Sequence, residues 1–182
     1  MDKEIISTFT TDETRFLSNF YPYKTKTGEK YPHKVSVYMN GIEFDCVENA
    51  YQAAKLLSKE EQIAFSKMTP YETKAIMDEG LKEVRPDWDN IKLDIMTELV
   101  FQKFLGSAEL TKLLLATGEK ELVEGNTWGD IFWGVCDEKG QNHLGQILMA
   151  ARSYLRKNSQ NKTYKTYLND FCMLNTKNNE RL

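Results

Sequence analysis

The 182-residue sequence has few cysteines, and their arrangement excludes the sites that cysteines commonly build. Cys46, Cys136 and Cys172 are odd in number and widely spaced, which matches neither a disulfide framework nor a metal-ligand pattern. We therefore expect reduced cysteines that serve in packing. The sequence predicts no metal site and no other cofactor.

Long apolar runs and an excess of basic charge are also missing. No stretch approaches the roughly 18 apolar residues that span a bilayer, and the start MDKEIIST has no signal-peptide run. We expect a cytosolic protein without a membrane partner. A net charge of −3 argues against a surface that binds nucleic acid mainly by neutralising phosphates, but it leaves a local basic pocket open.

Motifs of several common enzyme classes do not occur. The two histidines, His33 and His143, stand apart in the sequence, so neither a zinc site nor a Ser-His-Asp arrangement can be argued. Neither a Walker loop nor a GxGxxG motif occurs. Any chemistry must come from other polar residues.

The apolar pattern predicts a mainly helical α+β single domain with a small antiparallel sheet or hairpins. With 41% hydrophobic residues, the chain can build one core. Asn40 and Gly41 suit a two-residue turn in a hairpin over 35–46. Helical periodicity and capping residues then predict helices at 47–58, after Thr69, and at 88–105, 108–118 and 142–158, with short strands at 4–10 and 121–126. The domain is predicted over 1–158, and the tail over 159–182 is either frayed or a short packed helix.

An apolar loop is predicted at FLSNFYP, residues 16–22, because its helical spacing lasts barely one turn before Pro22. The loop either closes the core as a plug or forms a pocket wall with Ser18 and Asn19 facing a ligand.

Polar residues within apolar segments mark three candidate sites. Glu48, Gln52 and Lys55 are spaced i, i+4 and i+7, which places them on one helix face. An exposed polar face is the alternative.

The other two candidates lie toward the C-terminal end. Asp130 stands between Trp128 and Trp133, in a ligand-facing loop or in a tight hairpin with aromatic packing. Asn142, as an N-cap, and Arg152 can hold an anion, or they can be an ordinary cap and a surface arginine.

Taken in order, six motifs resemble the YbiA-like proteins, also called the NADAR superfamily. They are FLSNFYP, VENAYQAAK, LVFQKF, LLLATGEKELVEGN, DIFWG and NHLGQILMAAR, within about residues 15–156. Asn49 replaces the usual His of the family, and Gly80-Leu81 replaces a usual Gly-Arg pair, for which Arg85 is a candidate substitute.

The resemblance implies a YbiA-like fold and an N-glycosidase that hydrolyses a ribosyl C1′–N bond. Its substrate would be a phosphoribosylamino-pyrimidine intermediate of riboflavin synthesis or an ADP-ribosylated guanine in a nucleotide, DNA or RNA. The implied substrate-binding residues are Phe16, Ser18, Asn19, Phe20, Tyr21, Gln52, Trp133, Gly134, Asn142 and Arg152.

Cleavage of such a bond needs a carboxylate near the cationic ribose carbon and a proton for the leaving nitrogen. We assign the carboxylate to Glu48, and either proton donation or Schiff-base formation to Lys55. Asp130 would position water or ribose hydroxyls, and Trp133 would stack on the base. The alternatives are a non-catalytic module that binds ADP-ribose or a related nucleotide, and a purely structural domain. The oligomeric state stays open.

Overall fold

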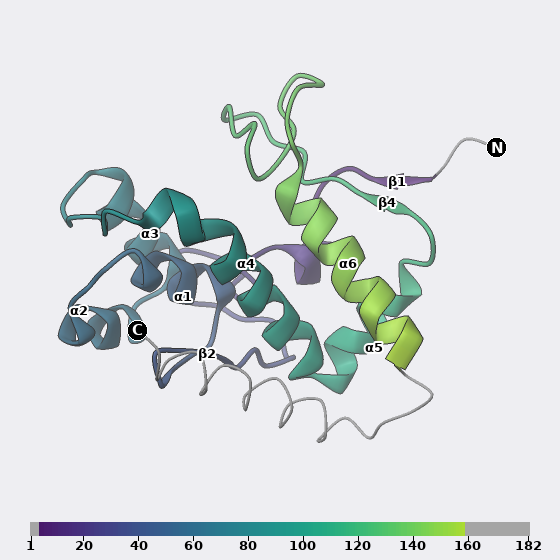
Figure 1. The fold of residues 1–182 in the computed structure, drawn as a ribbon. Coiled ribbons are helices and arrows are strands. Elements are labelled where there is room, and N and C mark those ends of the chain that lie inside the picture. The colour runs from purple at the N-terminus through teal and green to yellow at the C-terminus, as the bar shows by residue number, and fades with distance from the viewer. Residues whose placement is uncertain (1–3, 159–182) are drawn as a thin grey trace.

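The computed structural model describes residues 4–158, and one long helix organises them. Figure 1 shows this helix, α4, in teal between two groups of shorter helices. The first group is α1 (Val47–Ala54), α2 (Lys59–Phe65) and α3 (Pro70–Asp78), and the second is α5 (Ala108–Ala116) and α6 (His143–Asn158), around α4 (Trp88–Leu105). The predicted mainly helical α+β domain is confirmed.

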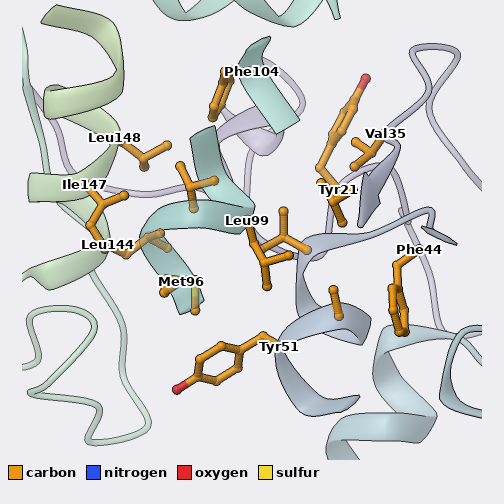
Figure 2. Packing of buried hydrophobic residues seen from close by; sticks show 14 of the residues in the cluster. Tyr21, Val35, Phe44, Tyr51, Met96, Leu99, Phe104, Leu144, Ile147 and Leu148 are labelled. Carbon is orange, nitrogen blue, oxygen red and sulfur yellow. The ribbon is translucent and has the colours of Figure 1, made fainter. Parts of the chain in front are cut away.

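The core lies where α4 packs on both groups. In Figure 2, Met96 and Leu99 of α4 lie between Tyr51 of α1 and Leu144 and Leu148 of α6. Full burial of such an apolar side chain contributes about 1.5–3 kcal/mol. This packing makes α4 a rigid support for the side chains at its ends.

Two small pairs of strands complete the fold. β2 (Val37–Met39) and β3 (Ile42–Phe44) form the predicted antiparallel hairpin, and the positive φ angles of 51° at Asn40 and 73° at Gly41 fit a type I′ turn. β1 (Ile5–Ile6) pairs with β4 (Glu121–Leu122) in parallel, which the prediction of antiparallel pairs did not include. Parallel strands need a long connection, so no local turn signal marks this pair.

Helix boundaries follow the capping residues. Thr69 and Glu72 form the predicted capping box of α3, and Ser107 caps α5. Helix α1 ends at Ala54, earlier than predicted. None of the helices within residues 4–158 has the length and apolar character that crossing a bilayer requires. The predicted tail helix lies outside the described residues, and the boundary at 158 stays a prediction.

Candidate active site

A cleft of about 340 Å³ opens beside the N-terminal half of α4. Its walls come from the loop after residue 18, helix α1, helix α3, helix α4 and the segment 124–133. The lining side chains are Asn19, Phe20, Glu48, Tyr51, Gln52, Lys55, Lys74, Trp88, Lys92, Met96, Glu124, Trp128, Asp130, Phe132 and Trp133. The structure therefore brings together seven of the residues predicted from the sequence: Asn19, Phe20, Glu48, Gln52, Lys55, Asp130 and Trp133.

Helix α1 places a carboxylate inside the protein. Glu48 is only 7% exposed and Gln52 only 2%, which contradicts the alternative of an exposed polar face. The amide Nε2 of Gln52 donates a hydrogen bond of 2.7 Å to Oε1 of Glu48. Burial raises the pKa of Glu48, while this hydrogen bond and the charges of Lys74 and Lys55 oppose the rise.

Lys55 caps the C-terminus of α1 and is half-buried. Its Nζ lies 5.4 Å from the centroid of the Tyr51 ring and 5.7 Å from that of Trp88. Burial lowers the pKa of Lys55, although the negative charge of Glu48 partly opposes this effect. A larger neutral fraction makes the amine a better nucleophile.

The FLSNFYP segment is both a plug and a pocket wall. Asn19 and Phe20 line the cleft, but Phe16 packs edge-on against Phe104, with 6.5 Å between the ring centroids. Tyr21 stacks on Tyr31 at 5.3 Å, also away from the cleft. Only part of the predicted binding loop therefore faces the cleft, because Phe16, in the 3₁₀ turn Arg15–Leu17, and Tyr21, beyond it, are both buried in the core.

Ser18 is one of the predicted binding residues that the structure places elsewhere. Its hydroxyl accepts a hydrogen bond of 3.2 Å from the backbone N–H of Phe20, and its carbonyl accepts one of 2.7 Å from Nζ of Lys103. Lys103 is 1% exposed, and burial lowers its pKa to about 7. The next carbonyl, of Asn19, accepts hydrogen bonds of 3.0 Å from the thiol of Cys46 and from the Glu48 N–H. These contacts fix the loop beside α1.

Two buried amide oxygens in the cleft lack hydrogen-bond partners. Oδ1 of Asn19 and Oε1 of Gln52 accept no hydrogen bond from any of the described residues. Each amide nitrogen is engaged, that of Asn19 at 3.3 Å from Sδ of Met96 and that of Gln52 on Glu48. Buried polar atoms without partners are uncommon, and here they offer acceptors to a ligand with hydroxyl or N–H donors.

The loop over 126–133 positions an acid and an indole together. Oδ1 of Asp130 accepts hydrogen bonds from the backbone N–H groups of Phe132 at 3.0 Å and Trp133 at 2.8 Å. The Trp133 ring packs edge-on against Tyr51, with 5.6 Å between centroids. Asp130 therefore holds the loop with one oxygen, while its other oxygen makes no hydrogen bond with the described residues.

Glu124, a half-buried residue that also lines the cleft, was not among the residues predicted from the sequence. Burial and the negative charges of Asp130 and Glu48 raise its pKa to about 8. Glu124 lies two residues after β4 and next to Gly125, and nothing in this local sequence marks it as a residue of a cleft. The other lining residues that were not predicted as binding residues are Tyr51, Lys74, Trp88, Lys92, Met96, Trp128 and Phe132.

Two of the predicted binding residues, Arg152 and Asn142, support the site from outside the cleft. Arg152 is buried and donates to Oγ1 of Thr117 at 2.7 Å and to the Lys120 carbonyl at 2.8 Å, so it is not a surface arginine. The amide of Asn142 donates to the Leu122 carbonyl at 2.9 Å and accepts from the Glu124 N–H at 3.1 Å. Its side chain therefore fastens strand β4 to α6 and is not available to an anion.

Gly134 has a packing role. A Cβ atom at this position would lie 2.2 Å from the Glu124 carbonyl oxygen, so only glycine permits this close approach of the two segments.

The two departures from the YbiA-like pattern have structural explanations. Asn49 donates to the Met68 carbonyl at 2.5 Å and accepts from the Thr73 hydroxyl at 3.1 Å, which fastens α1 to α3. Arg85 pairs with Asp87 at 2.6 Å and does not line the cleft. The basic side chains that line the cleft are instead those of Lys55, Lys74 and Lys92, and the pKa of Lys55 is lowered by burial.

The acids of the cleft do not form a metal site. Within the described part of the chain, no three His, Cys, Asp or Glu side chains form a group that could hold a metal ion.

Known proteins resemble this chain over most of its length. A model described as the NADAR domain matches residues 8–156. N-glycosidase Npun_R5314 of Nostoc punctiforme is 35% identical over 130 residues, 69% of this chain and 81% of that protein. Riboflavin biosynthesis protein VVA0006 of Vibrio vulnificus is 34% identical over 79% of this chain, which corresponds to only 36% of that protein.

N-glycosidase YbiA of Escherichia coli is 32% identical over 144 residues, 75% of this chain and 87% of YbiA. The NMR structure of the E. coli protein YbiA matches the present fold with a TM-score of 0.72 and 28% sequence identity. This structural match covers 90% of this chain and 91% of the YbiA chain.

Proposed function

The chain belongs to the NADAR family, and on this basis we propose that it is an N-glycosidase that hydrolyses a ribosyl C1′–N bond. The names of the Nostoc and E. coli relatives support this reaction class. The cleft supports it independently, since it combines a buried carboxylate, a depressed lysine pKa and several aromatic rings.

The unpaired oxygens of Asn19 and Gln52 carry the proposal. They lie in the same cleft as the carboxylate of Glu48, so a ligand that bonds to them also comes close to that charge. Ribose presents several hydroxyl donors, and its C1′ becomes cationic when the C1′–N bond breaks. A ribosyl group therefore satisfies both the acceptors and the carboxylate.

Each of the cleft residues has a separate role in the proposed reaction. Ionised Glu48 stabilises the oxocarbenium-like carbon, and the second oxygen of Asp130 orients water or a ribose hydroxyl. When the ribose ring opens, the base nitrogen stays on C1′ as an imine. Neutral Lys55 adds to C1′, the bond from C1′ to the base nitrogen breaks, and Lys55 remains attached as a Schiff base that water hydrolyses. Trp133 binds the base by stacking.

The family resemblance implies two classes of substrate, and the cleft can accommodate features of both. The name of the Vibrio relative favours a phosphoribosylamino-pyrimidine, and the lysines at the cleft suit its phosphate. An ADP-ribosylated guanine is the second candidate, since aromatic side chains at the cleft can stack on its bases.

We expect the protein to release a free base from at least one of these substrates. Both candidates are incubated with the protein, and the released base is identified by mass spectrometry. Release from neither would contradict the proposed function, and tight binding without release, measured by calorimetry, would instead identify a nucleotide-binding module.

Asp130 and Trp133 are expected to affect different kinetic constants. Asp130→Ala should mainly lower kcat, because the carboxylate orients reacting groups, whereas Trp133→Ala should mainly raise KM through lost stacking. Steady-state kinetics separates the two effects. If circular dichroism shows that both variants merely lose folded protein, the loop has only a packing role.

A further inference from the structure

Glu124 is a carboxyl group of the cleft that the mechanism above does not use. Its backbone is held from two sides, since the N–H donates to Asn142 at 3.1 Å and the carbonyl accepts from the Val135 N–H at 2.9 Å. Gly134 packs directly against the same carbonyl. The side chain therefore projects from a rigid point of the cleft wall.

The carboxyl group itself is unpaired. It makes no hydrogen bond or ion pair with any residue of the described range 4–158. Three charged groups act on it: Asp130 from the loop, Glu48 from α1 and Lys74 from α3. Two of the three are acids, and together with burial they raise the pKa of Glu124 to about 8. The raised pKa favours the protonated form of this unpaired cleft carboxyl group near neutral pH.

The reaction needs such a proton. A nitrogen that leaves C1′ takes the electron pair of the broken bond and must be protonated. Lys55, as the neutral nucleophile, gives up one proton when it adds to C1′, but departure of the nitrogen as a free amine requires a second proton. Glu48 must stay ionised to stabilise the cation. Two carboxyl groups of one active-site cleft commonly divide the roles of general acid and charge stabiliser in this way.

We propose that Glu124 is the general acid that protonates the leaving nitrogen, an inference that rests on the proposed N-glycosidase function. The C1′–N bond breaks, its electron pair goes to the nitrogen, and the carboxyl O–H of Glu124 gives its proton to that nitrogen. Water then adds to C1′ of the Schiff base and returns one proton to the Glu124 carboxylate. The second proton of the water goes to the Lys55 nitrogen as its bond to C1′ breaks. The net reaction consumes one water and releases the free base and the sugar.

The test replaces Glu124 with Gln, which keeps the size and polarity of the side chain but has no proton to release. We expect kcat to fall by about 10²- to 10⁴-fold, the usual range for a lost general acid, with a nearly unchanged KM. Glu121→Gln is the matched control, because it removes a carboxylate from the same segment outside the cleft, and its kcat should equal that of the wild type.

The pH profile provides a second measurement. A general acid must be protonated, so on the alkaline side of the pH optimum wild-type kcat should fall as the pH rises through the pKa of about 8. This alkaline limb should disappear in Glu124→Gln and persist in Glu124→Asp. Lys103 also titrates in this range, with a pKa of about 7. An alkaline limb caused by Lys103 would persist in Glu124→Gln, so its disappearance identifies Glu124.

Each possible result supports or contradicts the role of Glu124 as the general acid. A Gln variant with wild-type kcat, or with the same alkaline limb, would overturn the role of Glu124 while leaving the N-glycosidase function intact. If the Gln variant does not fold, a wild-type profile without a fall between pH 7 and 9 would overturn it. If the wild-type protein cleaves no ribosylated substrate, that result would contradict both the proposed function and the role of Glu124.

Discussion

Glu48→Gln is expected to lower the turnover of C1′–N cleavage by at least about two orders of magnitude, the size typical of removing one charge-stabilising group at a reacting centre. The carboxylate faces a carbon that gains positive charge, and a neutral amide cannot replace its charge. The amide still accepts the hydrogen bond from Gln52, and it has the same volume, so packing is preserved. Steady-state kinetics measures the loss.

Two controls separate chemistry from folding in this experiment. Thermal unfolding should show that Glu48→Gln remains folded, and Glu83→Gln, an exposed position outside the cleft, should keep full activity. The wild-type enzyme should lose turnover as the pH falls through the raised pKa of Glu48, because only the ionised form stabilises the cation. Near wild-type turnover of Glu48→Gln would refute its assignment.

Lys55→Ala and Lys55→Arg are expected to be equally inactive, with turnover reduced by more than about two orders of magnitude. Arginine keeps the positive charge, but a guanidinium cannot form an imine. Borohydride added during the reaction should trap a protein–ribose adduct, and peptide mass spectrometry should locate it at Lys55. The depressed pKa of Lys55 supports this, since the neutral amine is the form that attacks.

The alternative for Lys55 is a charged side chain that holds a phosphate or pairs with Glu48. In that case Lys55→Arg keeps appreciable activity, and no adduct forms while substrate is consumed. Lys67→Ala, at an exposed position outside the cleft, controls for nonspecific loss of a lysine. An adduct at Lys74 or Lys92, which line the same cleft, would identify that residue as the nucleophile in place of Lys55.

The sequence alone determined the local structure and the family. Capping residues such as Thr69 and Ser107, and the Asn40-Gly41 turn, act over a few residues, so their effect can be predicted from neighbours in the chain. The six motifs likewise placed Glu48, Lys55 and Asp130 among the site residues before any contact was known.

Only the tertiary structure decided which polar side chains face the cleft. Arg152, Asn142 and Ser18 have the same chemistry as ligand-binding residues. However, Arg152 and Asn142 donate to backbone carbonyls far away in the sequence, and the Ser18 carbonyl accepts from the distant Lys103 side chain. Such pairs depend on how α6, β4 and the N-terminal loop dock, and no local spacing encodes that arrangement.

The same reason explains why Glu124 was missed. Its proton affinity depends on Glu48 and Asp130, which the fold brings close from separate segments, and on the burial that the assembled cleft imposes. Burial and long-range charge are properties of the packed protein, because water screens these groups in the extended chain. The residue types were therefore visible in the sequence, whereas their protonation and their orientation toward a ligand were set by packing.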